Sequence, residues 1–292
     1  MANYLVSYST KEYYQRHAEM NKSAEKYGIT NIISYFDYDL KSRSFYKKNR
    51  EILDIPKGAG LWLWKPFFIL EGLTKLQDGD CLLYVDSGSL FISDPSELYK
   101  ICNTNKSGIL AFDASPLNNS QWTKRDTFIN LNADEKRYWE CNHIIGTVVG
   151  FRKSKFTVEF VKEWLKYCQD YNTIAESENI RGKENLPDFI SHRMDQSILS
   201  ILIERYNIET YRNPSKWGNY LKTEPFRQND EFVGYPYLVK DTIHEYASHP
   251  YFNSPYGTIF IFNRKLENNK SAPVKISFYE KYFKGFYFSK RK

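Results

Sequence analysis

Residues 81–85, CLLYV, form an uninterrupted apolar run that ends on one carboxylate, Asp86. A strand without alternating polar residues has both faces covered, which is typical of a parallel sheet between two layers of helices. Residues 2–9 and 29–37 also have strand character, and residues 10–28 between them suit a helix that ends at Gly28. This alternation predicts an α/β domain with a mostly parallel central sheet flanked by helices.

Later segments fit the same architecture. Proline is tolerated in the first turn of a helix, so a helix is expected at Pro66, with an apolar stripe made of Phe67, Leu70, Leu73 and Leu76. Two further helices are expected at about 154–170 and 189–206, and a late strand at 256–263. We predict one domain over 1–265, followed by a basic, aromatic C-terminal tail over 266–292.

Composition excludes several classes of protein. The chain has 292 residues, 41% of them hydrophobic, which is enough for one large domain with its own core. Its four cysteines are far apart and form no C-x-x-C pair, so they are expected to be reduced, buried thiols. The net charge of +6 permits an anionic ligand, and no nucleic acid is expected as a partner. Because no signal peptide or membrane-spanning run is evident, a cytoplasmic location is expected.

Asp86 is the first candidate for a functional residue. It stands at the carboxyl end of a predicted strand, where open α/β sheets bind their ligands. Ser87 and Gly88 follow it and leave room for a ligand to approach the backbone. A carboxylate is a hard oxygen ligand for magnesium or manganese, which commonly bridge to phosphates. The alternative is an ordinary turn after the strand.

The segment GAGLWLWKPFFILEGLTKLQDGDCLLYVDSG, residues 58–88, resembles a stretch of GT-A-type glycosyltransferases, especially bacterial and viral polysaccharide-type enzymes. In these enzymes a W-x-W-K-P motif opens a helix, and an apolar strand follows that ends in D-x-D or a relaxed D-x-G. The resemblance implies a GT-A (Rossmann-like) fold and places Asp86 beside a nucleotide-sugar and its metal. The third motif position is Gly88, so one usual metal ligand is missing.

The same segment supplies two further candidates for donor binding. Lys65 is expected to contact a phosphate, and Trp62 to stack on a base or sugar. The alternatives are an exposed lysine in the first helical turn and tryptophans packed in the core. In the stretch 121–154, Asn142 loosely matches residues that line the sugar pocket of such enzymes, and Lys124 and Asp126 are candidates for acceptor binding. Each of these is also compatible with a structural role.

The segment HRMDQSILSIL, residues 192–202, resembles the Asp-Gln segment of retaining transferases such as glycogenin and lipopolysaccharide galactosyltransferases. That resemblance implies that Asp195 orients the donor sugar and that Gln196 lies on its reacting face. There are two alternatives for Asp195. It could act as a general base in an inverting reaction, or it could cap the helix. His192 and Arg193 either pair with the pyrophosphate or face solvent.

Two predictions concern the C-terminal part. Many GT-A enzymes use a late histidine as a metal ligand, so Asp86 and His249 are predicted to hold Mn²⁺ or Mg²⁺. The alternative for His249 is an ordinary histidine. The aromatic residues and lysines of the tail suit peripheral contact with an anionic membrane at its inner face. The alternative is a tail that packs on the domain.

Taken together, these features predict a glycosyltransferase. It would move a sugar from a nucleotide-diphosphate sugar, UDP-linked, to a hydroxyl of a glycan or lipid-linked glycan in surface polysaccharide synthesis, with retention of configuration favoured. The alternative is a carbohydrate-binding or scaffold protein with a degenerate transferase fold. A nucleotidyltransferase is disfavoured because the amino-terminal part has no glycine-rich, basic phosphate loop.

Overall fold

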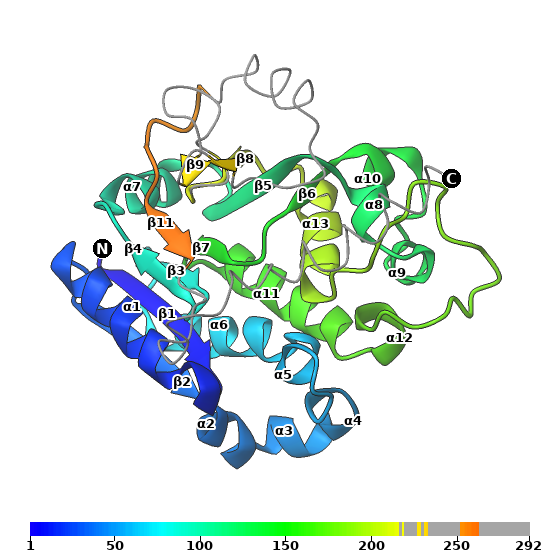
Figure 1. Cartoon of the computed structure of the whole chain (residues 1–292), viewed down its shortest axis with the longest axis horizontal. Coiled ribbons are helices and arrows are strands. Elements are labelled where there is room, and N and C mark those ends of the chain that lie inside the picture. Colours follow the sequence, from blue (N-terminus) through cyan, green and yellow to red (C-terminus); the bar gives the residue numbers. More distant parts are fainter. Residues whose placement is uncertain (216–217, 219–226, 229–230, 233–251, 263–292) are drawn as a thin grey trace.

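A computed structural model describes residues 1–215, 218, 227–228, 231–232 and 252–262. Its centre is a sheet of order β2-β1-β3-β7-β5-β6, with β8 paired to β5 (Figure 1). The strands of this sheet are β1 (Asn3–Ser9), β2 (Asn31–Phe36), β3 (Cys81–Val85), β5 (Ile109–Asn118), β6 (Asn142–Ile144), β7 (Val148–Arg152) and β8 (Thr210–Arg212). The predicted tail over 266–292 and His249 lie outside the described residues.

The sheet is mixed, so the prediction of a mostly parallel sheet is wrong. β1 runs parallel to β2 and β3, and β8 runs parallel to β5. In contrast, β7 is antiparallel to both β3 and β5, and β6 is antiparallel to β5. An uninterrupted apolar strand indicates that both faces are covered, and it leaves the direction of the neighbouring strands open.

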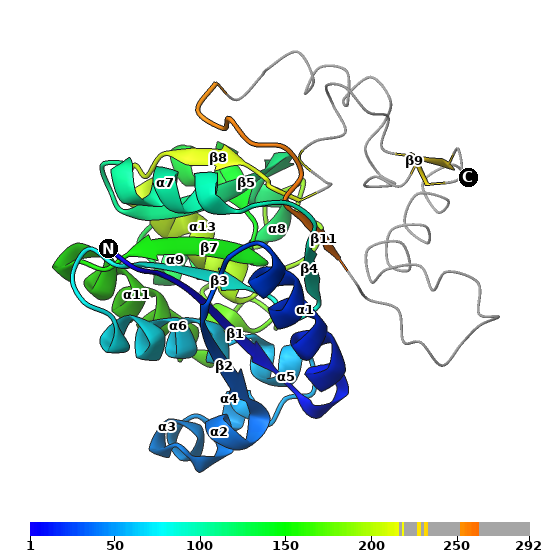
Figure 2. The ribbon, with the colours of Figure 1, turned by 90° about the vertical axis from the view of Figure 1, so that its left-hand side faces the viewer.

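Helices cover both faces of the sheet. Figures 1 and 2 show α7 on one side of β3 and β7, and α6 and α11 on the other. The side chains of β3 divide between the two resulting cores: Leu82 and Tyr84 pack on the α6 side, and Leu83 packs on the α7 side. The principal helices are α1 (Tyr14–Lys26), α6 (Trp64–Lys75), α7 (Ser96–Thr104), α11 (Lys155–Cys168) and α13 (Asp195–Arg205).

Most predicted elements are present, with one large shift in a boundary. α11 matches the helix expected over 154–170. α13 begins at Asp195 instead of near residue 189. The backbone of Met194 has φ 50°, which is not helical, and Arg193 donates its N–H to the carbonyl oxygen of Trp122 at 3.1 Å. The residues before Asp195 therefore bond to a neighbouring segment in place of the helix.

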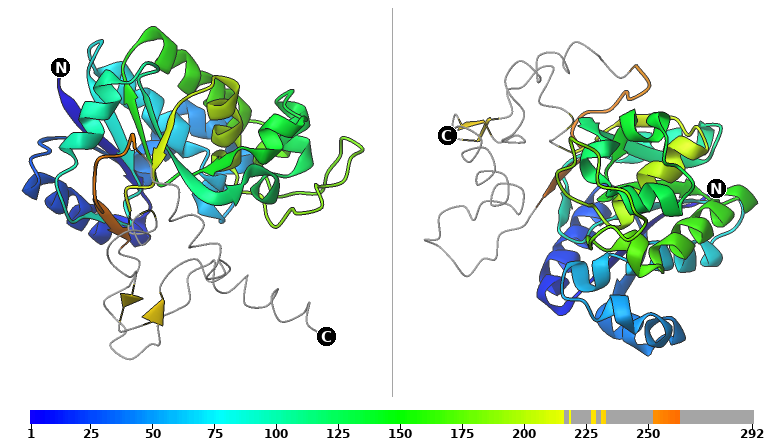
Figure 3. Two further views of the ribbon diagram at one scale, coloured as in Figure 1. Left: turned by 90° about the horizontal axis from the view of Figure 1, so that it is seen from above. Right: turned by 90° about the vertical axis from the view of Figure 1, so that its right-hand side faces the viewer.

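The remaining elements are short. In Figure 3, left, the segment that joins α12 to α13 extends from the body of the molecule. Within the described residues, no helix has the length and apolar character needed to span a membrane. The short elements are η1 (Lys11–Tyr13), α2 (Asp37–Ser42), α3 (Ser44–Lys48), α4 (Arg50–Leu53), α5 (Gly58–Leu61), α8 (Asn119–Trp122), α9 (Arg125–Asn130), α10 (Lys136–Glu140), α12 (Tyr171–Ile174), β4 (Ser89–Phe91), β9 (Arg227–Gln228), β10 (Glu231–Phe232) and β11 (Phe260–Phe262).

Candidate functional site

A pocket of about 740 Å³ opens at the carboxyl ends of the parallel strands β1 and β3. The beginning of α13 and the segment before α6 complete its walls. Ligands bind at this edge of open α/β sheets, and the volume is within the usual range for small-molecule sites. The pocket is lined by residues 8–10, 12–13, 56–59, 62, 64–65, 86–89, 146–147, 191–196 and 262.

The pocket brings together most of the residues singled out in the sequence. Three segments that are far apart along the chain meet in it, and the predicted residues among its lining are Trp62, Lys65, Asp86, Ser87, Gly88, His192, Arg193, Asp195 and Gln196. Asn142, Lys124 and Asp126 do not line it.

Lys65 is buried between the two acidic residues of the pocket. Its Nζ donates to the carbonyl oxygen of Gly146 at 2.7 Å, and it lies 3.5 Å from Asp86 Oδ1 and 3.4 Å from Asp195 Oδ2. Burial alone would lower the pKa of Lys65, but the carboxylates of Asp195 and Asp86 raise it above its ordinary value. The alternative interpretation, in which Lys65 is an exposed lysine in the first helical turn, is therefore wrong.

Asp195 is the first residue of α13 and is 3% exposed. Burial raises its pKa to about 6; the attraction of Lys65 opposes this rise, and the nearby charge of Asp86 adds to it. Asp195 Oδ2 has no hydrogen-bond partner among the described residues, and Lys65 is its ion-pair partner. The residue is therefore a carboxylate at neutral pH whose bonding capacity is not filled by the protein.

Asp86 lies at the end of β3, as predicted, and it also begins a turn. Its carbonyl oxygen accepts the N–H of Ser89 at 3.0 Å, so the turn interpretation is correct as well. The hydroxyl of Tyr84 donates to Asp86 Oδ1 at 2.5 Å. The side chain of Asp86 remains 30% exposed. The turn thus presents the carboxylate to the pocket while Tyr84 fixes its orientation.

A left-handed turn carries Trp62 into the pocket. Residues 58–62 all have positive φ, from 50° at Ala59 to 99° at Gly60. A Cβ on Gly58 would meet the ring of Trp62 at 2.3 Å, and one on Gly60 would meet the backbone of Leu53 at 2.7 Å. Both positions therefore require glycine, and Ala59, Leu61 and Trp62 hold a conformation that L-residues rarely adopt.

The two tryptophans of the W-x-W motif both contact the core and both line the pocket, but they differ in burial. Trp64 is 6% exposed and belongs to the core, which agrees with one of the alternatives. Its ring is tilted by 34° against that of Tyr8, with ring centres 4.2 Å apart. Trp62 is partly buried against the same core and also lines the pocket. Its predicted stacking on a base or sugar stays a prediction.

His192 and Arg193 both line the pocket, but His192 cannot supply a positive charge there. Burial, together with the ammonium of Lys124, lowers the pKa of His192 to about 3. Its Nδ1 accepts the N–H of Lys124 at 3.3 Å, so the proton of the neutral ring is on Nε2, which has no partner among the described residues. The guanidinium of Arg193 lies over the ring of Trp122, 4.3 Å from its centre.

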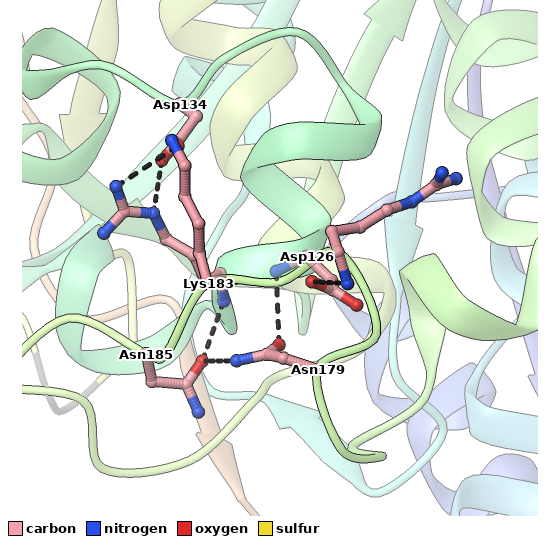
Figure 4. Close-up of polar contacts among 7 residues, drawn as sticks. Asp126, Asp134, Asn179, Lys183 and Asn185 are labelled. Carbon is pink, nitrogen blue, oxygen red and sulfur yellow. Dashed lines mark hydrogen bonds and ion pairs between the residues drawn. The ribbon is translucent and has the colours of Figure 1, made fainter.

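Asp126 has a structural role in this arrangement. It is fully buried, and its carboxylate accepts the N–H groups of Ile180 at 2.6 Å and Arg181 at 3.2 Å. Figure 4 shows Asp126 beside Asn179 and Asn185, whose side chains are hydrogen-bonded to each other at 2.9 Å. We call the set Arg125, Asp126, Asp134, Asn179, Lys183 and Asn185 the Asp126 network; it fastens the segment between α12 and α13 to α9.

Lys124 and Asn142 are also placed away from the pocket lining. Lys124 is 1% exposed, and its Nζ donates to the hydroxyl of Ser177 at 2.9 Å. Asn142 is exposed at the beginning of β6, where it pairs with Asn118. The described geometry gives no support to direct acceptor contact by Lys124 or Asp126, or to a place for Asn142 in the sugar pocket.

The residues of the pocket do not fit a metal ion held jointly by Asp86 and Asp195. Among the described residues, no three His, Cys, Asp or Glu side chains gather in a way that could bind a metal. The ammonium of Lys65 already lies between the two carboxylates, and its charge opposes a second cation on the same oxygens. The predicted pairing of Asp86 with His249 is untested, because His249 lies outside the described part of the chain.

The sequence analysis did not identify the wall of the pocket at the end of β1. It also did not identify Glu176, which connects two other walls of the pocket. Ser9, the last residue of β1, lines the same pocket as Asp86, and so do Thr10 and Glu12, which follow the strand. The parallel pairing of β1 and β3 was the available signal, because it places both carboxyl ends at one edge. Glu176 was also missed: its carboxylate pairs with Lys57 Nζ at 2.7 Å and accepts the hydroxyl of Ser191 at 2.7 Å.

No protein-family model and no curated protein matches the chain. Several solved structures are similar, and those described here are glycosyltransferases. WbbM, a bifunctional glycosyltransferase, has 12% identity and a TM-score of 0.46 over 85% of this chain and 44% of WbbM. Mouse xyloside xylosyltransferase 1 has 10% identity and a TM-score of 0.47 over 93% of this chain and 100% of that one.

A glycosyltransferase involved in glycosylation of the major capsid of PBCV-1 has 10% identity and a TM-score of 0.40 over 91% of this chain and 96% of that one. The chain spans less than half the length of WbbM. At these identities and TM-scores, the similarities do not bear on substrate or mechanism.

Proposed function

We propose that this protein is a glycosyltransferase that moves a sugar from a nucleoside-diphosphate sugar to a hydroxyl of an acceptor. One observation carries the proposal: the segments around Lys65, Asp86 and Asp195, whose sequence patterns resemble GT-A-type enzymes, line the same pocket. The pocket lies at the carboxyl ends of parallel strands, where such a ligand is expected. The resemblance in sequence and the placement of the three segments in one pocket are independent observations.

The proposed chemistry follows from the position and charge of Asp195. The acceptor oxygen forms a bond to the anomeric carbon, and the bond from that carbon to the diphosphate oxygen breaks, so the nucleoside diphosphate leaves with the electron pair. In the retaining reaction, the acceptor hydroxyl passes its proton to the departing diphosphate oxygen. Asp195, ionised at neutral pH because its pKa is about 6, orients the donor sugar, and Gln196 lies at its reacting face. In the inverting alternative, Asp195 takes the proton of the acceptor hydroxyl as general base.

Substrate identity rests on the sequence resemblance. We propose a UDP-linked donor and a glycan or lipid-linked glycan acceptor of surface polysaccharide synthesis, with retention of configuration. The predicted manganese or magnesium ion, with Asp86 and His249 as ligands, stays a prediction. When bound, such an ion would neutralise charge on the departing diphosphate.

The test is a panel of nucleotide-sugars with the full-length protein, with and without Mn²⁺. Release of free nucleotide is measured together with the melting temperature, which rises when a ligand binds the folded state. Asp86→Asn keeps an acceptor for the Tyr84 hydroxyl and is expected to abolish turnover without unfolding the protein. Asp78→Asn, at the exposed turn before β3, is the matched control and should behave like the wild type.

Two outcomes would contradict the proposal. Near-normal turnover by Asp86→Asn would remove Asp86 from the reaction. A rise in melting temperature with every donor, without any nucleotide release, would favour the carbohydrate-binding or scaffold alternative. An NMR assay of the product anomer separates retention from inversion.

A further inference from the structure

The ammonium of Lys65 lies among three oxygens that could equally surround another cation. Gly146 supplies a carbonyl oxygen at 2.7 Å, and Asp86 and Asp195 supply carboxylate oxygens at 3.5 Å and 3.4 Å. Carboxylate and carbonyl oxygens are also the ligands that Mg²⁺, Mn²⁺ and Ca²⁺ take in proteins. In chemical terms, the three oxygens form a cation site that the chain fills with its own side chain.

The surroundings keep Lys65 in this place. Its side chain is 3% exposed, so the ammonium has little access to solvent. Its Nζ lies 5.3 Å from the centre of the Tyr84 ring and 5.9 Å from that of the Trp64 ring, at distances where aromatic faces attract a cation. The contact with Gly146 is a hydrogen bond, and the two carboxylates attract the ammonium by charge.

The charges explain why a metal ion and Lys65 compete. Two carboxylates at Asp86 and Asp195 repel each other, and a cation between them offsets this repulsion. A divalent ion shared by the two would lie about 2.0–2.6 Å from their oxygens. It would therefore come within a few ångströms of the lysine ammonium, where two positive charges in a buried site repel strongly.

We infer that Lys65 is the resident cation of Asp86 and Asp195, and that these two carboxylates do not share a divalent metal ion. The inference deepens the proposed function and rests on it for the identity of the pocket as a donor site. Lys65 is then a positioning residue: its charge holds Asp195 beside Asp86, and its Nζ donates a hydrogen bond to the carbonyl oxygen of Gly146. A metal bound elsewhere on Asp86 would have to use ligands other than Asp195.

The inference predicts that removing the ammonium creates a metal site. Mn²⁺ binding is measured by calorimetry on full-length wild type, Lys65→Met and the double variant Lys65→Met/Asp195→Asn. Lys65→Met is expected to gain a Mn²⁺ site that the wild type lacks. The double variant should bind Mn²⁺ at least about tenfold more weakly than Lys65→Met, because a supporting carboxylate is lost. Lys75→Met is the control, since Lys75 is on the same helix but is half exposed.

Two results would overturn the inference. The first is a wild-type Mn²⁺ site that Asp195→Asn alone weakens at least tenfold, because the two carboxylates would then share an ion beside Lys65. The second is a folded Lys65→Met that gains no site. If Lys65→Met fails to fold, Lys65→Gln, which keeps donors for Gly146, replaces it, and the wild-type comparison remains decisive.

These measurements do not depend on turnover. A protein that shows the expected Mn²⁺ binding but releases no nucleotide from any donor would contradict the proposed function and leave the inference about Lys65 intact. A protein that turns over a donor but shares an ion between Asp86 and Asp195 would support the proposed function and contradict the inference about Lys65.

Discussion

Asp126 and Asp195 are both buried carboxylates in the first turn of a helix, but their bonding differs. The oxygens of Asp126 accept two backbone N–H groups from the segment between α12 and α13. Asp195 has the ammonium of Lys65 3.4 Å from an oxygen that lacks a hydrogen-bond partner among the described residues, and it faces the pocket. A carboxylate satisfied by backbone donors stabilises a fold, whereas one held by charge at a cavity retains capacity for a ligand.

The largest expected effect is on turnover at Asp195. Asp195→Asn keeps the size of the side chain but removes the charge, so turnover should fall by about two orders of magnitude or more, as for the loss of a positioned catalytic group. The melting temperature should change little, because burial of the charge is itself unfavourable. Turnover rates and thermal melts of both proteins check this. Comparable turnover in the variant and the wild type would show that Asp195, like Asp126, is not needed for the reaction.

The second prediction concerns pH. Because burial raises the pKa of Asp195 to about 6, turnover should rise as the pH increases through about 6 and then level off. The folded state binds this proton more tightly than the unfolded state, so the contribution of Asp195 to stability should fall as the pH rises from about 4 to about 6. Rate profiles between pH 5 and 8 test the first part, and a sloping profile retained by Asp195→Asn would assign the titration to another group.

The sequence predicted which residues line the pocket better than it predicted which residues contact one another there. The apolar run of β3 placed Asp86 at a strand end, and the Asp-Gln segment placed Asp195 in the same pocket. Local patterns could not show that the ammonium of Lys65 lies between them, because that depends on how α6, β3 and α13 pack. Asp126 was chosen for its residue type, and only the folded chain shows that its acceptors are filled.

Three structural features could not be predicted from the sequence, for a different reason. The direction of β7 depends on long-range pairing, which the apolar pattern of β3 does not encode. The shortened α13 depends on bonds from Arg193 to Trp122 that compete with the helix. The left-handed turn over 58–62 was not predicted, because such a turn is sterically costly and therefore rare.

The third prediction concerns stability at Asp126. Asp126→Asn replaces one accepting oxygen with a donor, which removes a hydrogen bond to the backbone of the exposed residues 180–181, at a cost of about 0.5–1.5 kcal/mol in the free energy of unfolding. Turnover by the folded fraction should stay near that of the wild type. Urea unfolding and turnover rates measure the two quantities, with Asp78→Asn as the control. Wild-type stability combined with lost turnover would restore the acceptor role that the sequence suggested.

The smallest effect is expected at Glu176. Like Asp126 it accepts hydrogen bonds that hold a segment in place, and like Asp195 it pairs with a lysine that lines the pocket. Glu176 pairs with Lys57 at 2.7 Å and also accepts the hydroxyl of Ser191 and the N–H of His192, so it ties two pocket walls together. Both members of the ion pair are 37% exposed, and such pairs contribute about 0.2–1 kcal/mol. Glu176→Gln keeps hydrogen-bonding capacity but loses the charge.

Glu176→Gln is therefore expected to be nearly as stable as the wild type, yet to bind the donor more weakly, because the wall that carries His192 is less firmly held. The change should appear in KM more than in kcat, and it should shrink at high salt, which screens the exposed pair in the wild type as well. Glu159→Gln, which removes a similar surface pair with Lys162, is the matched control. Equal KM values for the two variants would show that Glu176 contributes no more than an ordinary surface charge and that the pocket walls are held by the buried contacts alone.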